Sequence, residues 1–292
     1  MIKSMTGFGR GEKVSQDCKV TVEIKAVNHR YCDINMKLPR KLNYLETDVR
    51  NYLKKSIGRG KVDVFISYED LTAGDVNVRL NEELGREYYQ AIMKLGETLH
   101  INGEVTALQV ARFSDVLTLE DLPVNQEYIR QQIMETLEAA LEHFSQSRER
   151  EGENLKEDIL RKLDGMKKNV EFIEKRYPEL ILEYRRKLED KVKELLGDTG
   201  IDESRIASEV VIYADKICVD EETVRLNSHI ENMKEELLKG GAVGRKLDFI
   251  AQEMNREANT ILSKANDMEV SNRAIDLKTE IEKIREQVQN IE

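Results

Sequence analysis

The chain has 292 residues, of which 40% are hydrophobic, 35% are charged and 3 are proline. This length can bury a sizeable core in about two domains, while many charges and few prolines favour long helices with charged outer faces. No stretch has a basic head before an apolar run, and none approaches the roughly 20 apolar residues that cross a bilayer. We therefore expect a cytoplasmic protein with no membrane association. The 3 cysteines lack Cys-x-x-Cys spacing, which argues against a disulfide framework and a thiolate zinc site.

The net charge of −10 is unevenly distributed along the chain. Residues 1–61 contain 14 Lys and Arg against 6 Asp and Glu, which gives +8 and leaves −18 for the remainder. One interpretation is that the basic region grips nucleic acid, while carboxylates elsewhere hold a cation or oppose the basic region of a neighbouring subunit. The other is that the two halves neutralise each other within the fold.

The first segment of note is Met5–Arg10, in which Gly7 and Gly9 allow close backbone approach. It is weak as a phosphate-binding loop, because no Lys-Ser or Lys-Thr follows and no helix opens directly after it. Beyond it, alternating apolar and polar residues predict strands, and three-and-four spacing predicts a helix. The predicted strands cover residues 19–27, 32–38 and 62–68, and the helix covers residues 40–57. This order indicates an α+β sandwich with helices on one face of a mainly antiparallel sheet.

Basic side chains gather at the ends of these elements. They are His29, Arg30, Arg40, Arg59 and Lys61. Residues at strand ends are held rigidly yet exposed, so this cluster suits a phosphate grip. Because we assign no stacking aromatic side chain to it, we expect it to contact the backbone of a nucleic acid rather than read its bases.

Helical patterns dominate the rest of the chain, beginning with residues 81–99 and 105–113. After residue 123 a long helical pattern is interrupted by the wholly polar residues 145–154, which we interpret as a hinge. Apolar residues keep three-and-four spacing on both sides of Pro178, which predicts a helical hairpin or coiled-coil arm. Its expected role is spacing or oligomerisation.

Four more helices are predicted near the C-terminus, at residues 202–217, 220–238, 244–265 and 274–291. In the second of them, Glu222, Arg225 and His229 line up three and four residues apart along the margin of the apolar stripe. Two carboxylates, those of Glu221 and Glu222, thus lie one or two turns from a histidine.

The helix at 244–265 has two distinct faces. Its core stripe consists of Leu247, Ile250, Met254, Ala258, Ile261 and Ala265. The opposite side is a polar ribbon of Asp248, Gln252, Asn255, Asn259 and Ser263, flanked by Arg256, Glu253, Glu257 and Lys264. Asn and Ser in a helix interior each destabilise the helix by a few tenths of a kcal/mol relative to good helix formers. We therefore expect the polar ribbon to make interactions that offset this cost. Either it forms a buried hydrogen-bond network between helices, or it binds a polar, phosphate-bearing ligand.

The predicted fold class is α+β. An N-terminal, mainly antiparallel sheet with helices is followed by a coiled-coil-like helical hairpin and a C-terminal all-α domain. The corresponding domains are a basic domain at 1–150, expected to bind nucleic acid, the hairpin arm at 151–200 and a helical domain with the candidate site at 201–292.

Six motifs carry a resemblance to a known family. They are SMTGFGR at residues 4–10, VNHRY at 27–31, EETVRLNSH at 221–229, GRKLDF at 244–249, QEMNREANT at 252–260 and IREQVQNIE at 284–292. On these motifs the chain resembles the YicC/YloC family of bacterial endoribonucleases over nearly its whole length. The resemblance implies metal-dependent cleavage of single-stranded or structured RNA in RNA turnover. It also implies a homo-oligomer, a hexamer being one form it could take, and association with other RNA-degradation enzymes.

One departure from the family pattern is visible. Relatives have Asp-Ile or Asp-Val before the paired glutamates, whereas this chain has Cys218-Val219-Asp220. If the usual aspartate is a metal ligand, either Asp220 substitutes for it or the site differs in this chain.

Two mechanisms fit an RNA-cutting site on these residues. In the first, Glu222, Glu253 and Glu257 hold Mg²⁺ or Mn²⁺, which activates water and neutralises charge on the phosphate. In the second, a histidine takes the proton from the 2′-hydroxyl and no metal is needed. The carboxylates beside His229, together with the resemblance, favour the metal. We assign catalytic roles to His229, Glu253, Arg256 and Glu257.

RNA contacts are expected from both ends of the chain. The candidate residues are Arg10, His29, Arg30, Arg40, Arg59, Lys61, Arg225, Arg245, Asn259 and Lys264. The alternative to an enzyme is a non-catalytic RNA-binding or scaffolding homo-oligomer, in which the helix at 244–265 is structural.

Overall fold

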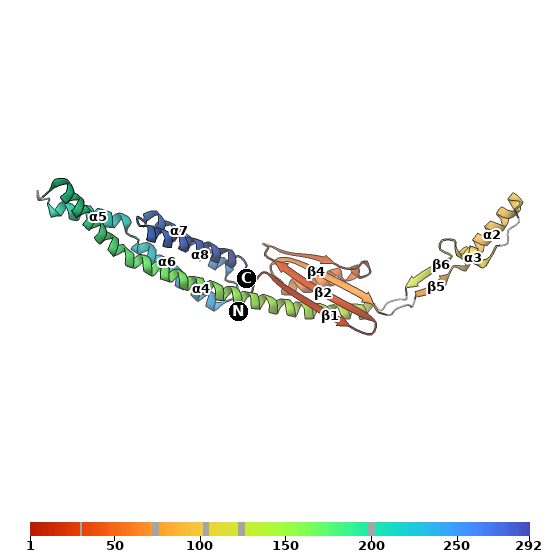
Figure 1. Cartoon of the computed structure of the whole chain (residues 1–292). Helices are drawn as coiled ribbons and strands as arrows, with labels where there is room; N and C mark the ends of the chain where they lie inside the picture. Colours follow the sequence, from red (N-terminus) through yellow and green to blue (C-terminus); the bar gives the residue numbers. More distant parts are fainter. Residues whose placement is uncertain (30, 72–75, 102–104, 122–125, 198–201) are drawn as a thin grey trace.

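The computed structural model describes residues 1–29, 31–71, 76–101, 105–121, 126–197 and 202–292. Its elements form three parts along an elongated molecule, with a helical bundle at one end, a four-stranded sheet in the middle and a small arm at the other end (Figure 1). Helices and strands together confirm the α+β class. In the described part of the chain, no helix combines the length and the apolar character that crossing a membrane requires.

The sheet consists of β1 (Gly7–Val14), β2 (Cys18–Val27), β3 (Cys32–Lys37) and β4 (Gly60–Asp70) in the order β1-β2-β4-β3. β1, β2 and β4 pair antiparallel and β3 pairs parallel to β4, so the predicted mainly antiparallel sheet is confirmed. Alternation along β2 buries Val20, Val22 and Ile24 on one face. A 3-10 helix, η1 (Arg40–Leu45), and α1 (Glu46–Ser56) pack into the same core.

β1 was not predicted as a strand, because three of its eight residues are glycine. A Cβ atom on Gly9 would lie 2.2 Å from the carbonyl oxygen of Ala140, and one on Gly11 would lie 2.3 Å from that of Thr136. The glycines therefore allow the long helix α4 (Gln126–Leu196) to pack backbone against backbone on β1. The close approach predicted for Gly9 exists, and its partner is a helix.

Helix α4 is continuous over 71 residues, so the predicted hinge at residues 145–154 is wrong. The side chains of this segment are polar because they form hydrogen bonds and ion pairs with residues at both ends of the chain. The buried guanidinium of Arg148 donates to the carbonyl oxygen of Ser4 at 2.5 Å and pairs with the Glu292 carboxylate. Gly152 makes room for the backbone of Ile2, whose carbonyl oxygen would lie 2.3 Å from an added Cβ.

The predicted helical hairpin across Pro178 is also wrong, because α4 runs straight through this residue. A proline removes one helical hydrogen bond and usually kinks or ends a helix. Here Tyr177 and Leu180, on either side of it, are buried in the core of the bundle, and this packing holds the helix together. The domain boundaries at residues 150 and 200 stay predictions.

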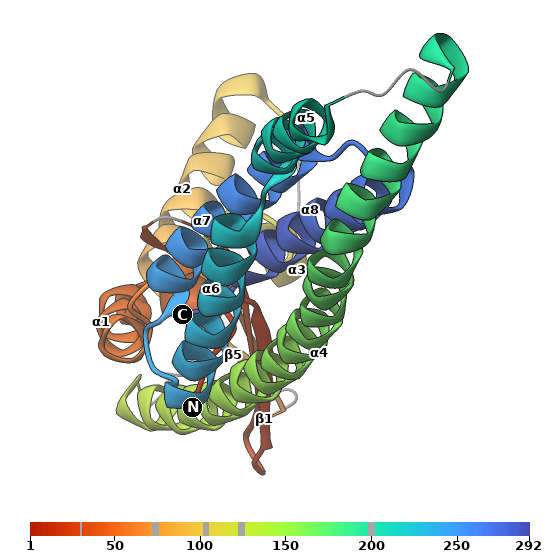
Figure 2. The same cartoon turned by 90° about the vertical axis from the view of Figure 1, so that its left-hand side faces the viewer.

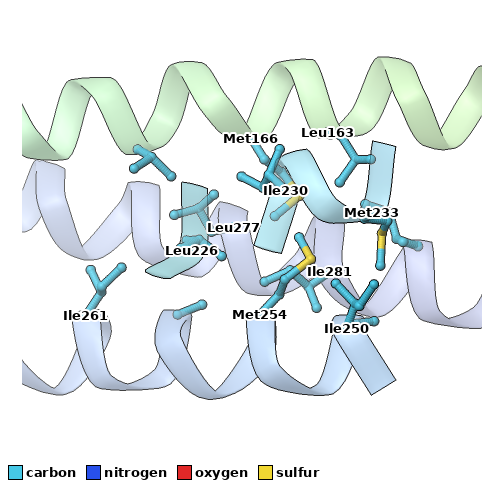
Figure 3. Close-up of a cluster of buried hydrophobic side chains, with 14 of the residues drawn as sticks. Leu163, Met166, Leu226, Ile230, Met233, Ile250, Met254, Ile261, Leu277 and Ile281 are labelled. Carbon is cyan, nitrogen blue, oxygen red and sulfur yellow. The ribbon is translucent and has the colours of Figure 1, made fainter. Parts of the chain in front are cut away.

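The bundle joins the second half of α4 to α5 (Glu203–Ile217), α6 (Asp220–Lys239), α7 (Gly244–Lys264) and α8 (Met268–Val288). Figure 2 shows α6, α7 and α8 side by side along α4. Their core is apolar throughout, with Met166 of α4, Ile230 of α6, Met254 of α7 and Ile281 of α8 all pointing inward (Figure 3). The predicted core stripe of the helix at 244–265 is confirmed from Leu247 to Ile261.

The arm consists of β5 (Val76–Leu80), α2 (Glu82–Leu99), α3 (Ala107–Ala111) and β6 (Leu117–Asp121), and it lies at the opposite end of the molecule from the bundle (Figure 1). Gly85 and Val116 are the buried residues among its described side chains. Ten large apolar side chains of the arm are between 38% and 66% exposed, namely Val78, Leu80, Tyr89, Met93, Leu95, Leu99, Ile101, Leu108, Phe113 and Leu117. The described part of the arm therefore has almost no core of its own.

Candidate active site between α6 and α7

Helices α6 and α7 form an antiparallel pair with charged side chains along their junction. At one end Lys246 Nζ lies 3.0 Å from Glu236 Oε1, and at the other end Lys264 Nζ lies 2.9 Å from Glu222 Oε1. Between them, Arg225 Nη1 lies 3.9 Å from Glu257 Oε1. His229 is one turn from Arg225, and Glu253 is one turn from Glu257, so both lie along the same junction. We call these eight residues, Glu222, Arg225, His229, Glu236, Lys246, Glu253, Glu257 and Lys264, the α6–α7 seam.

The seam contains buried carboxylates. Glu222, Glu236 and Glu257 are 8%, 6% and 5% exposed. Burying an ionised carboxylate is expensive unless it is paired and hydrogen-bonded, so each needs a partner. Hydrogen bonds from Lys239 and then Lys246 lower the pKa of Glu236 and keep it ionised.

Glu222 forms an ion pair that joins two helices. Lys264 Nζ donates to Glu222 Oε1 and to the carbonyl oxygen of Cys218, both at 2.9 Å. The hydrogen bond to Glu222 raises the pKa of Lys264, so its ammonium group stays protonated. This contact ties the end of α7 to the start of α6.

Glu257 is the least satisfied of the three buried carboxylates. Among the described residues its charged partner is Arg225, at 3.9 Å, and no hydrogen bond reaches its carboxylate. Arg225 is itself 57% exposed at its side chain and donates to Glu221 Oε2 at 2.8 Å. A buried carboxylate with a loosely held, partly exposed arginine beside it can exchange protons or bind a cationic or proton-donating ligand.

The predicted metal ligands are not assembled within one chain. In the part of the chain that the structure describes, no group of three or more His, Cys, Asp or Glu side chains is placed to hold a metal ion. Glu222 is bound to Lys264, and the half-buried Glu253 lies 4.0 Å from Arg256 Nη1. Glu222, Glu253 and Glu257 therefore do not fit a complete metal site by themselves.

Part of the polar ribbon of α7 forms hydrogen bonds between helices, and part of it is exposed and accessible to a ligand. Asn255 Nδ2 donates to Glu282 Oε1 at 2.9 Å, and Arg285 Nε donates to Asp248 Oδ1 at 3.2 Å, so these positions form a network with α8. Gln252, Arg256 and Asn259 remain exposed. Phe249 is exposed beside them and was missed, although a large apolar residue outside the core stripe was a readable signal.

The predicted basic cluster lies only partly together. Arg59 Nε donates to the carbonyl oxygen of His29 at 3.1 Å, and Lys61 follows at the start of β4. Asn28 Nδ2 donates to the carbonyl oxygen of Gln289 at 2.8 Å, which places this end of the sheet against the end of the bundle. Arg30 lies outside the described residues.

Two other predicted RNA contacts lie away from the His29 end, Arg40 in η1 and Arg10 in β1. Arg40 is separated from the His29 end by the whole length of β3, which spans about 20 Å at 3.3 Å per residue. Arg10 is on the exposed face of β1, where it pairs with Glu12 at 2.8 Å and Glu23 at 3.6 Å. Arg245 is exposed at the start of α7.

Comparison with known proteins gives consistent matches over the whole chain. The family described as "Endoribonuclease YicC-like, N-terminal region" matches residues 2–157, and "Endoribonuclease YicC-like, C-terminal" matches residues 173–292. A protein of Clostridioides difficile (strain 630) named "Probable endoribonuclease YicC" is 42% identical over 293 residues, which cover 100% of both chains. A protein of the same name from Haemophilus influenzae is 32% identical over 296 residues, again covering 100% of both chains.

Proposed function

The chain belongs to the YicC-like endoribonuclease family, and we propose that it cuts RNA internally at the α6–α7 seam. The observation that carries this placement is the buried Glu257 carboxylate beside the partly exposed Arg225, within a turn of Glu253 and in line with His229. Such a group can take a proton, while the arginine can meet a phosphate. The names of both relatives support the endoribonuclease activity itself.

The seam supplies groups for cleavage by the 2′-hydroxyl of the RNA. Glu257 or His229 would accept the proton of the 2′-hydroxyl, whose oxygen then attacks phosphorus. The bond to the 5′-oxygen breaks, and the other of the two groups returns a proton to that leaving oxygen. Arg225 and Arg256 would balance the negative charge that develops on the phosphate. The products of this route are a 2′,3′-cyclic phosphate and a 5′-hydroxyl.

We also propose that a divalent cation, Mg²⁺ or Mn²⁺, assists the reaction. Such an ion neutralises charge on the phosphate and can lower the pKa of bound water. Because the three predicted carboxylate ligands do not form a complete site in one chain, further oxygen ligands would have to come from the RNA or from a second copy.

Incubation of the purified protein with end-labelled RNA, with and without EDTA, tests the proposed function. Internal cleavage that EDTA removes supports the cation, with 2′,3′-cyclic phosphate ends if the ion assists the 2′-hydroxyl and 5′-phosphate ends if it activates water instead. Internal cleavage that persists in EDTA, with 2′,3′-cyclic phosphate ends, supports the route through Glu257 and His229 alone. No cleavage under either condition contradicts the enzyme.

The second candidate function is a non-catalytic RNA-binding or scaffolding assembly in RNA turnover. It is favoured by the ion pairs that already occupy Glu222 and Glu236 and by the lack of a metal cluster within the described residues. The same cleavage experiment separates it from the enzyme. Association with other RNA-degradation enzymes stays a prediction.

The basic end of the sheet is proposed to hold the RNA backbone near the seam. The His29 end contacts Gln289 and Asn290, and Gly244, which begins α7, packs against Ile291. The sheet end and the start of α7 therefore flank the same C-terminal segment. RNA held by Arg59 and Lys61 could continue onto α7.

Replacing Arg30, Arg59 and Lys61 together with serine is expected to weaken RNA binding and to reduce its salt dependence. The slope of log affinity against log salt should fall by about one unit for each phosphate that the variant no longer neutralises. Fluorescence anisotropy titrations at several salt concentrations measure this slope. The matched control removes three exposed cations from α4, Arg185, Lys187 and Lys191, and should leave the slope unchanged. An unchanged slope in the first variant would remove this region from the RNA path.

We propose that the arm mediates homo-oligomerisation, for which a hexamer is one candidate state. Its exposed apolar residues border a cavity of about 990 Å³ whose lining includes Ile92, Leu95, Ile101 and Phe113. Every copy of the chain carries this apolar surface. A partner that covers it in every copy must therefore be present in the cell in at least the same number of molecules as the chain itself. A second copy meets that condition.

Changing Leu95 and Leu99 to glutamate is expected to lower the assembled mass to that of a smaller oligomer or a monomer, because the charges would be buried in the interface. Analytical ultracentrifugation measures the mass. Leu182→Glu, at an exposed position on α4, is the matched control and should keep the wild-type mass. An unchanged mass in the Leu95 and Leu99 variant places the interface elsewhere.

A further inference from the structure

Helix α7 presents an exposed stripe of five residues on the side away from its core. Arg245, Phe249, Gln252, Arg256 and Asn259 follow one another at intervals of three and four residues, which places them on one face. We call this face the α7 outer stripe. It contains two arginines and no carboxylate, in a chain whose net charge is −10.

Phe249 is the unusual member of the α7 outer stripe. Its side chain is 62% exposed, whereas the apolar residues Leu247, Ile250 and Met254 of the same helix are 3% exposed or less. Phe249 therefore contributes little to the core of the bundle. It lies one turn from Arg245 and two turns from Arg256, so a flat apolar ring is flanked by cations on both sides.

The arginines of the stripe are available to a ligand. Among the described residues Arg245 forms no ion pair, and Arg256 reaches its nearest carboxylate, that of Glu253, only at 4.0 Å with 76% of its side chain exposed. Arg245 and Arg256 are eleven residues apart, or about 16 Å along the helix. A flexible polyanion can contact both, and an aromatic ring between them offers a stacking surface for a base.

We infer that the α7 outer stripe binds single-stranded RNA, with one unpaired base stacked on Phe249 and with Arg245 and Arg256 contacting phosphates. This inference rests on the proposed function for its choice of RNA. It adds a reason for preferring unpaired RNA, because a base within a duplex is already stacked and paired and cannot lie on the ring. Stacking tolerates every base, so little sequence preference is expected.

The stripe also places the RNA against the seam. Gln252 and Arg256 of the stripe are the direct neighbours of Glu253 and Glu257 in the chain. Consecutive residues of an α-helix lie about 100° apart around its axis, so an RNA strand along the stripe would pass on the face of α7 next to the seam. Phe249 is a positioning residue in this arrangement and takes no part in the bond changes.

Binding of a fluorescein-labelled oligouridylate and of a labelled RNA duplex, both in EDTA so that cleavage and binding stay separate, tests the inference. Phe249→Ala should weaken oligouridylate binding roughly 5- to 150-fold, which corresponds to the roughly 1–3 kcal/mol that loss of a stacked base costs by alanine substitution. Phe249→Tyr should keep most of the affinity because it keeps the ring. Val224→Ala removes a side chain that is 65% exposed on α6 and should bind like the wild type. Duplex binding should be the same in all four proteins.

Three results would overturn the inference: unchanged oligouridylate binding in Phe249→Ala, equal losses for oligouridylate and duplex, or a changed oligomeric mass, which would make Phe249 a contact between copies. The outcome is separable from that of the proposed function. A protein that binds oligouridylate through Phe249 but cuts no RNA supports the inference and refutes the nuclease. If the wild-type protein cuts RNA while Phe249→Ala binds oligouridylate normally, the nuclease is supported and the inference is refuted.

Discussion

Replacing Glu257 with glutamine is expected to slow RNA cleavage by at least about 100-fold, which is the lower end of what a positioned general acid or base contributes. Glutamine keeps the shape of the side chain and removes its charge and its capacity to accept a proton. RNA affinity and the thermal unfolding temperature should change little, because the ion pair of Glu257 with Arg225 is long at 3.9 Å. Single-turnover cleavage rates, anisotropy titrations and thermal melts measure the three quantities.

Two further variants calibrate this prediction. Glu253→Gln is also expected to abolish cleavage, because Glu253 is one turn from Glu257 and their carboxylates repel unless a cation or proton lies between them. Glu235→Gln, on the exposed side of α6, is the matched control and should cut at the wild-type rate. Cleavage at the normal rate by Glu257→Gln would remove the seam as the active site. His29, which lies outside the seam, would then be the next residue to replace.

Replacing Gly9 with alanine is expected to lower the free energy of unfolding by about 3 kcal/mol, at the upper end of the usual range for overpacking. The added Cβ would lie 2.2 Å from the carbonyl oxygen of Ala140, so the backbone of α4 or of β1 must move. Chemical denaturation followed by circular dichroism measures the change.

The control for Gly9 is a glycine with open space around it. Apart from the backbone of its own helix, an added Cβ on Gly165, inside α4, has no heavy atom of the described residues within 4 Å. Gly165→Ala should therefore stabilise the protein by up to about 1 kcal/mol through helix propensity alone. Equal midpoints for Gly9→Ala and the wild type would show that the α4–β1 contact is looser than the structure has it.

Local patterns predicted the sheet wherever side chains alternate. β2 has a strict alternation from Val20 to Ala26, and its strand was predicted correctly. β1 was not predicted because glycine contributes no hydrophobic signal to an alternating pattern. Its glycines are needed because helix α4 packs closely on them, and the contacting part of α4 lies about 130 residues later in the chain. Such a contact between distant segments has no local signature.

The same limit explains the two errors on α4. The polar segment around Arg148 resembled a linker because its partners, Ser4 and Glu292, lie at the two ends of the chain. Pro178 resembled a helix end because the packing of Tyr177 and Leu180 that holds the helix is tertiary. Local propensity was overridden in both places by contacts that sequence spacing cannot show.

For the candidate site, helical spacing predicted which residues would share a face but not their partners. The positions of Glu222, Arg225 and His229 on α6 and of Glu253 and Glu257 on α7 do lie along one seam. The pairing of Glu222 with Lys264, which withdraws it from the predicted metal set, depends on the register between two helices. Phe249 could have been recognised from the sequence, since it lies outside the core stripe.

Cleavage of a circular single-stranded RNA by the wild-type protein and by Glu257→Gln is the most direct measurement of the central claim, because a circle has no ends for an exonuclease to attack. We expect the wild type to convert the circle to a linear product and then to shorter fragments. We expect Glu257→Gln to bind the circle with the same affinity and leave it closed. A circle that stays intact with the wild type, or one that both proteins open at the same rate, would contradict an endoribonuclease whose active site is the α6–α7 seam.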